Sequence, residues 1–307
     1  MAHLLSRTAK VSVCLAFLGI VSCGVDPAKT EVSASEPVVD CRGDTLRLQQ
    51  PPRRIATLAP NLTELVYALG VDELLIGVTE HCNYPDDAND KPKIALFNNV
   101  NIEALMAGNP DLVLASRGNS ADNISQIRAL GVPVYGCCVN GLDDLLSTTA
   151  TLGRLLGATV AADSLIDSWK QRIERITRHK ITDRPRVFYG GADEPIYSVG
   201  PGSYLHDLIG DAGGQNVLSD SPTSWPRIDL ESLVSRDPQV IVVGYHEFRH
   251  AGEIAEALAG RSGWKEMSAV KNRRVVVVGE EALRPGPRLI DVFEVFAAAT
   301  HPEWFAD

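Results

Sequence analysis

A stretch that occurs twice in the chain constrains its fold more than any other feature. The first copy runs from Phe97 to Leu114 and the second from Trp225 to Val242. In each copy a glutamate, Glu103 or Glu231, follows the aromatic residue, and a helical pattern, a proline and an apolar run come next. The constant offset of 128 residues is too long for a solenoid and indicates two comparable β/α lobes. The competing explanation is that any two β/α units look this similar.

Composition sets the class of protein and excludes one class of partner. The 307 residues predict one large or two medium domains, and 45% hydrophobic with 22% charged residues is typical of a globular chain. The net charge is −10, the calculated pI is about 5.2 and no basic run occurs. We therefore expect no nucleic-acid partner.

Residues 1–22 have the pattern of an export signal. Arg7 and Lys10 precede an apolar run that is too short to span a bilayer, and the run ends at Ser22 and Cys23. This ending is similar to a bacterial lipobox and predicts cleavage before Cys23 and lipid attachment to it. Residues 23–37 are small and polar, which predicts a flexible tether. An ordinary signal peptide or a membrane anchor is the alternative.

The rest of the chain alternates strand and helix patterns, which predicts an α/β fold with parallel-type central sheets flanked by helices. Residues 38–157 form the predicted N-terminal lobe and residues 182–307 the predicted C-terminal lobe. The segment 158–181 carries a helical apolar line without any strand signal. We therefore expect a single long α-helix to join the two lobes.

Three local features carry more detailed expectations. Val38–Leu48 predicts a hairpin, and Asn61 followed by Glu64 predicts a capping box at a helix start. Cys137 and Cys138 are expected to be small buried hydrophobes, because a bridge between adjacent cysteines is strained. The disulfide state of the cysteines in the mature chain is left open: Cys41, Cys82, Cys137 and Cys138.

Four aromatic residues fall in predicted loops at strand ends or just before helices. They are Tyr84, Phe97, Tyr197 and Trp225, two in each lobe. Ligands of α/β sheets bind at that edge, and large ligands with flat faces gain most from aromatic walls. The aromatics thus predict a lined cleft between the lobes. The alternative is that each one caps the core.

Charged residues near the same edge extend this prediction. Arg117, Arg284 and Arg288 follow predicted strands and could donate to ligand carbonyls or carboxylates, or be solvated surface residues. Glu103 and Glu231 each lie in the first turn of a predicted helix, where the dipole favours a carboxylate. Their symmetric placement predicts a docking surface for a two-fold partner that offers arginines.

Motifs for catalysis are sparse. The chain contains no G-x-S-x-G, P-loop or dinucleotide motif. His246, Glu247 and His250 match the letters H-E-x-x-H of zinc proteases, but they directly follow a predicted strand, and a loop would not hold that spacing on one face. We therefore expect no enzyme, no bound metal and no cofactor, with a metal-dependent hydrolase as a remote alternative.

Taken together, several segments resemble the substrate-binding proteins of ATP-binding-cassette importers. The resemblance is to the class with one long interlobe helix, which serves cobalamin, ferric siderophores and haem, and within it to the cobalamin-binding members. It covers about Val38 to His301. It is carried by RRIATLAPNLTELVYALG, GVTEHCNYP, NIEALMAGNPDLVLASRG, SWPRIDLESLVSRDPQVIVV and RPGPRLIDVFEVFA.

The resemblance implies roles for residues and partners. The family's ligand-holding aromatics match Tyr84, Phe97, Tyr197 and Trp225, its late polar contacts match Glu280 and Arg284, and its permease-docking glutamates match Glu103 and Glu231. The implied protein is an extracytoplasmic, lipid-anchored monomer that delivers a corrinoid to a permease dimer with ATPase subunits. Ser116 and Phe97 depart from the cobalamin pattern, and the hairpin resembles siderophore-binding members, so a ferric siderophore or haem is the alternative ligand.

Overall fold

The computed structural model describes residues 36–96, 99–244 and 251–306. These residues belong to one compact unit. None of the helices within these ranges is both long and apolar enough to cross a membrane. The predicted signal peptide, most of the tether and Cys23 lie outside the described residues.

The N-terminal lobe is built on a six-stranded sheet with the order β6-β5-β4-β3-β7-β8. All neighbouring strands are parallel except β5 and β6, which form an antiparallel pair. The strands are β3 (Ile55–Thr57), β4 (Leu75–Thr79), β5 (Lys93–Leu96), β6 (Asn99–Val100), β7 (Leu112–Ser116) and β8 (Val134–Cys137). The helices are α1 (Pro60–Ala68), α2 (Ile102–Ala107) and α3 (Ala121–Ala129), with 3-10 turns η1 (Asp72–Leu74) and η2 (Asp86–Asp90).

The C-terminal lobe repeats this plan on a smaller, parallel sheet with the order β11-β9-β13-β14. Its strands are β9 (Arg186–Gly190), β11 (Gln215–Asn216), β13 (Val240–Gly244) and β14 (Val275–Val278), beside an antiparallel pair β10 (Ile196–Tyr197) and β12 (Arg227–Ile228). Its helices are α6 (Tyr204–Asp211), α7 (Leu230–Arg236), α8 (Ala251–Gly260), α9 (Ser268–Lys271) and α10 (Leu289–Thr300), with 3-10 turns η3 (Trp264–Glu266), η4 (Glu280–Leu283) and η5 (Pro302–Trp304).

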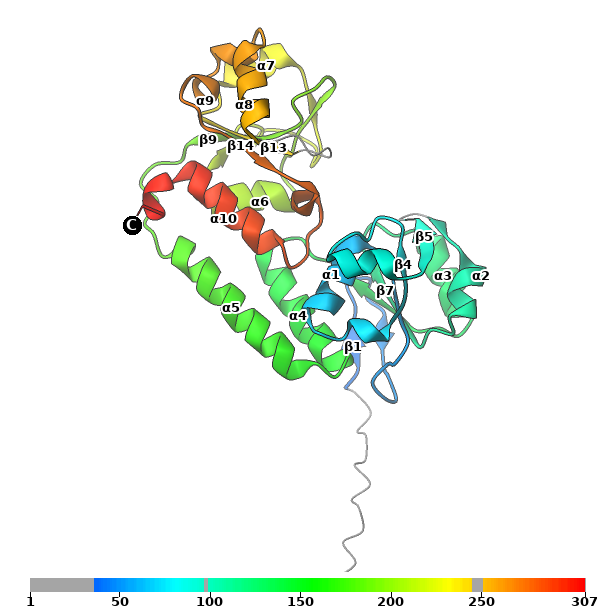
Figure 1. Ribbon diagram of the computed structural model, residues 1–307. Helices are drawn as coiled ribbons and strands as arrows, with labels where there is room; N and C mark the ends of the chain where they lie inside the picture. Colours follow the sequence, from blue (N-terminus) through cyan, green and yellow to red (C-terminus); the bar gives the residue numbers. More distant parts are fainter. Residues whose placement is uncertain (1–35, 97–98, 245–250, 307) are drawn as a thin grey trace, which may run out of the picture. The chain divides into compact units, whose positions relative to one another are not determined.

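Two helices follow the N-terminal sheet along the chain, and the second and longer one leads to the C-terminal sheet. Helix α4 (Leu142–Leu155) packs against α5 (Thr159–Thr177), and α5 also packs against α10 of the C-terminal lobe (Figure 1). Helix α5 is the predicted joining helix and is the longest helix described, with 19 residues. The predicted fold class, two β/α lobes joined by one long helix, is confirmed.

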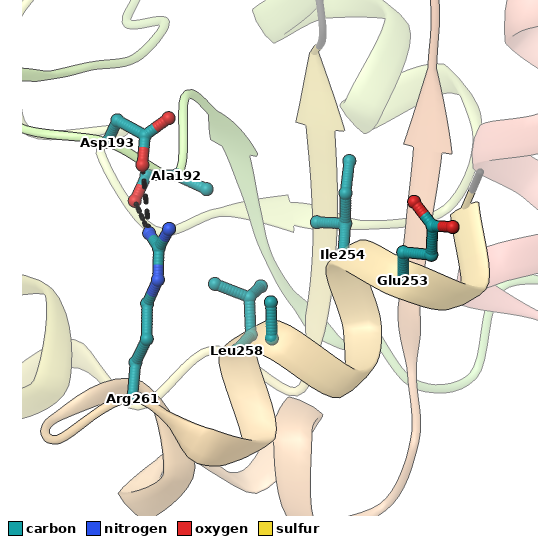
Figure 2. A pocket seen from close by; sticks show the side chains of 7 residues that line it. Ala192, Asp193, Glu253, Ile254, Leu258 and Arg261 are labelled. Atoms are coloured by element: carbon teal, nitrogen blue, oxygen red, sulfur yellow. Dashed lines mark hydrogen bonds and ion pairs between the residues drawn. The ribbon is translucent and has the colours of Figure 1, made fainter. Parts of the chain in front are cut away.

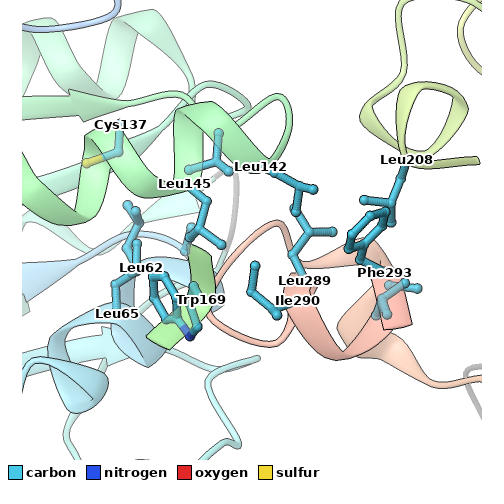
Figure 3. Packing of buried hydrophobic residues seen from close by; sticks show 14 of the residues in the cluster. Leu62, Leu65, Cys137, Leu142, Leu145, Trp169, Leu208, Leu289, Ile290 and Phe293 are labelled. Atoms are coloured by element: carbon cyan, nitrogen blue, oxygen red, sulfur yellow. The ribbon is translucent and has the colours of Figure 1, made fainter. Parts of the chain in front are cut away.

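One hydrophobic cluster extends through both lobes and the connecting helices. Leu62 comes from the N-terminal lobe, Trp169 from α5 and Phe293 from α10, and all three are at most 5% exposed. Figure 3 shows neighbouring members of this shared core from these elements and from α4 and α6. Two smaller hydrophobic clusters lie within single lobes, one in the C-terminal lobe and one in the N-terminal lobe. The joint between the lobes is therefore filled by packed apolar side chains.

The two copies of the repeat fold alike. Near its start each copy has a short strand, β6 or β12, that pairs antiparallel with a strand outside the copy. Each helix is capped by a side chain, since Asn101 accepts from the Ala104 amide at 2.9 Å and Asp229 from the Ser232 amide at 2.7 Å. Each helix is followed by a residue in the left-handed region, Asn109 with φ 46° and Asp237 with φ 43°. The strands that follow, β7 and β13, are both interior strands of their sheets.

The capping box predicted at Asn61 and Glu64 is wrong. Helix α1 begins at Pro60, and its N-cap residue Ala59 makes no side-chain capping bond. Proline suits the first helical position because it has no amide hydrogen to satisfy. Glu64 does not reach back to the helix start but faces the protein interior, where its side chain is 2% exposed and is bonded to Arg288.

The predicted hairpin is confirmed, and it explains why one cysteine prediction is wrong. Strands β1 (Val38–Val39) and β2 (Thr45–Leu46) pair antiparallel, and between them Cys41 forms a disulfide with Cys138. Adjacent residues at the end of a strand point in opposite directions. Cys137 therefore turns into the core and is free and buried as predicted, whereas Cys138 turns to the hairpin. Burial, aided by Asp40, raises the pKa of the Cys137 thiol.

An ion-pair network fastens α5 to α10. Arg172 donates to both oxygens of Glu294 at 3.0 and 2.6 Å and to Asp291 at 2.6 Å, while Arg175 donates to Glu294 at 2.6 Å. The hydrogen bonds from Arg172, together with both guanidinium charges, lower the pKa of Glu294 below its ordinary 4.5. The network therefore stabilises the fold above that pH and stops doing so as the pH falls through the folded-state pKa.

We expect Glu294→Gln to lower the free energy of unfolding by about 1 kcal/mol at about pH 7. The difference from the unmodified protein should shrink between about pH 7 and about pH 3, because Glu294 takes up its proton as the pH falls through its lowered pKa. Urea unfolding at both pH values measures this. Glu174→Gln, at an exposed position of the same helix, is the control and should change little. An equal loss at both pH values would show that Glu294 stabilises the fold without its charge.

Candidate ligand-binding site

Three of the predicted aromatic residues hold large apolar surfaces in solvent. Tyr84 is 47% exposed, Tyr197 59% and Trp225 52%, although the hydrophobic effect favours burial of each. Tyr84 lies in the loop between β4 and η2, Tyr197 ends β10, and Trp225 precedes β12. Aromatic side chains of this size make these three residues candidates for the wall of a ligand site. Phe97 lies outside the described residues.

The antiparallel ribbon β10–β12 places Tyr197 and Trp225 near each other. Tyr197 is paired with Arg227, and the Ser198 amide donates to the Pro226 carbonyl at 2.9 Å. Trp225 is the residue directly before this pairing. The backbone hydrogen bonds thus fix both aromatics of the C-terminal lobe on one two-stranded support.

A partly buried tyrosine supports Trp225. The ring of Tyr204 meets the Trp225 ring edge to face, with centroids 6.3 Å apart, and its hydroxyl donates to the Ala282 carbonyl at 2.7 Å. Burial raises the pKa of Tyr204 well above its ordinary value of 10, so the hydroxyl keeps its proton and donates. Tyr204 thereby links Trp225 to η4, which begins with Glu280.

The structure brings Glu280 and Arg284 together as an ion pair. Arg284 also donates to the Asn83 side chain at 2.6 Å and lies 3.9 Å from Glu64. The side chain of Arg284 is 13% exposed and that of Glu280 is 39% exposed. Since Asn83 is the neighbour of Tyr84, this ion pair connects η4 of the C-terminal lobe to the loop that carries Tyr84 in the N-terminal lobe.

A second arginine in this region binds a partner that the sequence did not indicate. Arg288 donates to both oxygens of Glu64, at 3.0 and 2.7 Å, and its guanidinium carbon lies 4.2 Å from the centre of the Tyr84 ring. Burial by itself lowers the pKa of Arg288, but the hydrogen bonds and charge of Glu64, with Glu281, outweigh it and raise that pKa. No local pattern in the sequence indicates this contact, because its two members are 224 residues apart.

Arg117 is not joined to this group by any contact within the described residues. Its guanidinium donates to the Asn140 side chain at 2.9 Å on an exposed surface. The neighbouring Ser116, which stands where the resembled proteins have an aromatic, is 9% exposed and bonded to Asn119. Arg42 of the hairpin holds this loop by donating to the Ser116 carbonyl at 2.8 Å. The hairpin therefore fixes the end of β7.

The two repeat glutamates occupy equivalent positions. Glu103 lies in the first turn of α2 and Glu231 in the first turn of α7, and both are exposed. Each follows a capped helix start, so the carboxylate meets the positive end of the helix dipole in both lobes. Glu103 and Glu231 therefore occupy matching positions in the two lobes, at the start of equivalent helices.

The H-E-x-x-H residues His246, Glu247 and His250 lie outside the described residues. Among residues 36–96, 99–244 and 251–306, no group of three or more histidine, cysteine or acidic side chains could hold a metal ion.

A separate small pocket lies in the C-terminal lobe, and it contains none of the predicted site residues. Its volume is about 160 Å3, and helix α8 and the loop after β9 line it (Figure 2). Arg261 donates to the Ala192 carbonyl at 2.8 Å and to Asp193 at 3.0 Å. The one arginine of the pocket is thus already paired, and the other acidic side chain of its lining is Glu253.

Comparisons with known proteins agree on one kind of protein. The model of a family described as periplasmic binding protein matches residues 55–282. The vitamin B12-binding protein of Vibrio cholerae serotype O1 is 29% identical over 247 residues, which cover 80% of this chain and 87% of the relative. An uncharacterized ABC transporter substrate-binding lipoprotein of Bacillus subtilis is 31% identical over 293 residues, covering 91% of this chain and 89% of the relative.

A solved structure resembles most of this fold. The crystal structure of the periplasmic vitamin B12 binding protein of Vibrio cholerae superposes with a TM-score of 0.72 at 27% sequence identity. The match covers 81% of this chain and 96% of that protein.

Proposed function

Because the chain belongs to the periplasmic binding protein family, we propose that it is the extracytoplasmic substrate-binding component of an ABC importer and that it captures cobalamin or a related corrinoid. A protein of this kind binds and delivers its ligand rather than converting it. The names of the vitamin B12-binding relatives support the choice of ligand.

The observation that carries the proposal is the set of half-exposed aromatics, Tyr84, Tyr197 and Trp225. A corrin ring offers a broad face for such side chains and a rim of amides. The paired Glu280 and Arg284 lie beside this wall and can exchange their mutual bond for hydrogen bonds to amides. Aromatic walls with a few placed polar groups are the usual design of small-molecule sites.

A calorimetric titration of residues 24–307 with cyanocobalamin tests this proposal. We expect one-to-one binding, and Trp225→Ala should weaken it about tenfold, because its ring contributes a large contact area. Phe305→Ala is the matched control, since Phe305 is 40% exposed but lies near the C-terminus, and it should bind normally. Binding of haem or a ferric siderophore without cobalamin would refute the corrinoid and keep the importer role. No binding of any of them would refute both.

We further propose that Glu103 and Glu231 dock the protein on the permease dimer, which works with ATPase subunits. Their equivalent, exposed positions on the two lobes suit a two-fold partner with arginines. The lipoprotein from Bacillus subtilis also supports lipid attachment at Cys23, which would keep the protein beside the permease.

The docking proposal predicts that uptake by cells can be lost while the affinity for the ligand is kept. The variant Glu103→Ala with Glu231→Ala should lower cobalamin uptake by cells at least about tenfold and leave the calorimetric affinity unchanged. Glu73→Ala with Glu256→Ala, at other exposed positions of the two lobes, should retain uptake. A loss of ligand affinity in the first variant, or normal uptake, would contradict the assignment.

A further inference from the structure

The contact between Arg288 and Tyr84 places a cation against one face of an aromatic ring. The guanidinium carbon lies 4.2 Å from the ring centre, well inside the range for attraction by the negative face of the ring. Tyr84 is nevertheless 47% exposed. Since one face is covered by the guanidinium, the exposed surface is available for a second group to stack on the ring.

Arg288 is itself held in place. It occupies the N-cap position of α10, its side chain is 19% exposed, and two hydrogen bonds of 3.0 and 2.7 Å join it to Glu64 of α1. Glu281 of η4 lies 3.6 Å away on its other side. A guanidinium fixed by two carboxylates cannot turn away from the ring without breaking buried ion pairs.

The two side chains come from different lobes. Tyr84 belongs to the N-terminal lobe, whereas Arg288 follows β14 in the C-terminal lobe. A nearby contact has the same character, because the Asn61 side chain donates to the Pro285 carbonyl at 3.0 Å. The orientation of an aromatic wall on one lobe therefore depends on a cation supplied by the other.

We propose that Arg288 is a positioning residue for ligand binding, which holds the Tyr84 ring and polarises it for stacking against an extended, electron-rich π-system. A cation on one face draws ring electron density toward itself, so the opposite face attracts electron-rich rings more strongly. This inference rests on the proposed function for its ligand. It adds a residue that acts through Tyr84 and needs no contact with the ligand.

The test is a double-mutant cycle with cyanocobalamin as the probe. Arg288→Lys keeps a charge for Glu64 but loses the planar group that stacks on the ring. We expect it to weaken binding about threefold to tenfold in the unmodified protein, and less than about twofold when Tyr84 is already leucine. The matched cycle of Arg288→Lys with Trp225→Ala should be additive, because Trp225 has no contact with Arg288 within the described residues.

A measurement without ligand separates this inference from the proposed function. In protein labelled with carbon-13 tyrosine, the ring resonance of Tyr84, assigned with Tyr84→Phe, should move in Arg288→Lys and stay unchanged in Arg117→Lys.

An unmoved resonance would overturn the stacking even if cobalamin binds. A moved resonance with equal affinity losses in both Tyr84 backgrounds would overturn the positioning role. If no ligand binds at all, the proposed function fails and the positioning role fails with it, while the resonance still reports the contact.

Discussion

Replacing Glu64 with alanine should lower the free energy of unfolding by about 3 to 5 kcal/mol. The carboxylate is 2% exposed and accepts two hydrogen bonds from Arg288, and Arg284 lies 3.9 Å from it. Its removal leaves two largely buried guanidinium groups without their shared partner, and the desolvation of Arg288 is then offset by Glu281 alone, at 3.6 Å. Urea unfolding of the purified variant measures the loss.

Two further variants identify the cause of that loss. Glu73→Ala, at an exposed position in the next turn, should change the stability by less than about 0.5 kcal/mol. Glu64→Met combined with Arg288→Met should recover part of the loss, because an apolar pair leaves no buried charge. If Glu64→Ala is as stable as the unmodified protein, the two arginines must be hydrated in the variant. The ion pair would then contribute nothing to the free energy of unfolding.

Replacing Cys41 and Cys138 with serine should cost about 4 kcal/mol of stability. The bridge closes a loop over a sequence separation of 97 residues, and a long loop loses much conformational entropy when it is closed in the unfolded chain. The hairpin that it holds has two strands of two residues, which are too short to be stable alone. Asp40 assists by accepting from the amides of Arg42, Asp44 and Gly136, each at 2.9 Å.

Thermal unfolding with and without a thiol reductant measures this effect. The reductant should lower the melting temperature of the unmodified protein to that of the double serine variant and leave the variant itself unchanged. Cys137 and Cys82 are free and buried, so they serve as internal controls that should resist alkylation until the chain unfolds. A melting temperature that is insensitive to reductant would contradict the stabilising role of the bridge.

The features that could be predicted from the sequence are those carried by nearby residues. The offset repeat indicated two alike β/α lobes, and the helical apolar line after residue 158 indicated the joining helix. The ion pair between Glu64 and Arg288 could not be predicted, because its members are 224 residues apart and neither has a local pattern that demands the other. Glu64 instead fitted a local capping rule, which lost to a proline at the helix start.

The candidate site also contains residues that could be predicted from the sequence and one that could not. Loop position and residue type were enough to select Tyr84, Tyr197 and Trp225, and the structure leaves each about half exposed. The polar pair of Glu280 and Arg284, four residues apart, was also within reach of sequence reasoning. Tyr204 was missed because its role depends on two tertiary contacts, with the ring of Trp225 and with the Ala282 carbonyl. Such supporting contacts depend on tertiary packing.

The shared core has a consequence for the autonomy of the lobes. Each lobe has its own sheet, so each could be taken for an independent folding unit. Yet Leu142 of α4, Trp169 of α5 and Phe293 of α10 belong to one buried cluster (Figure 3). Dividing the chain after α5 would expose this apolar surface on both fragments. We therefore expect the two lobes to unfold together, as one cooperative unit, although each has its own sheet.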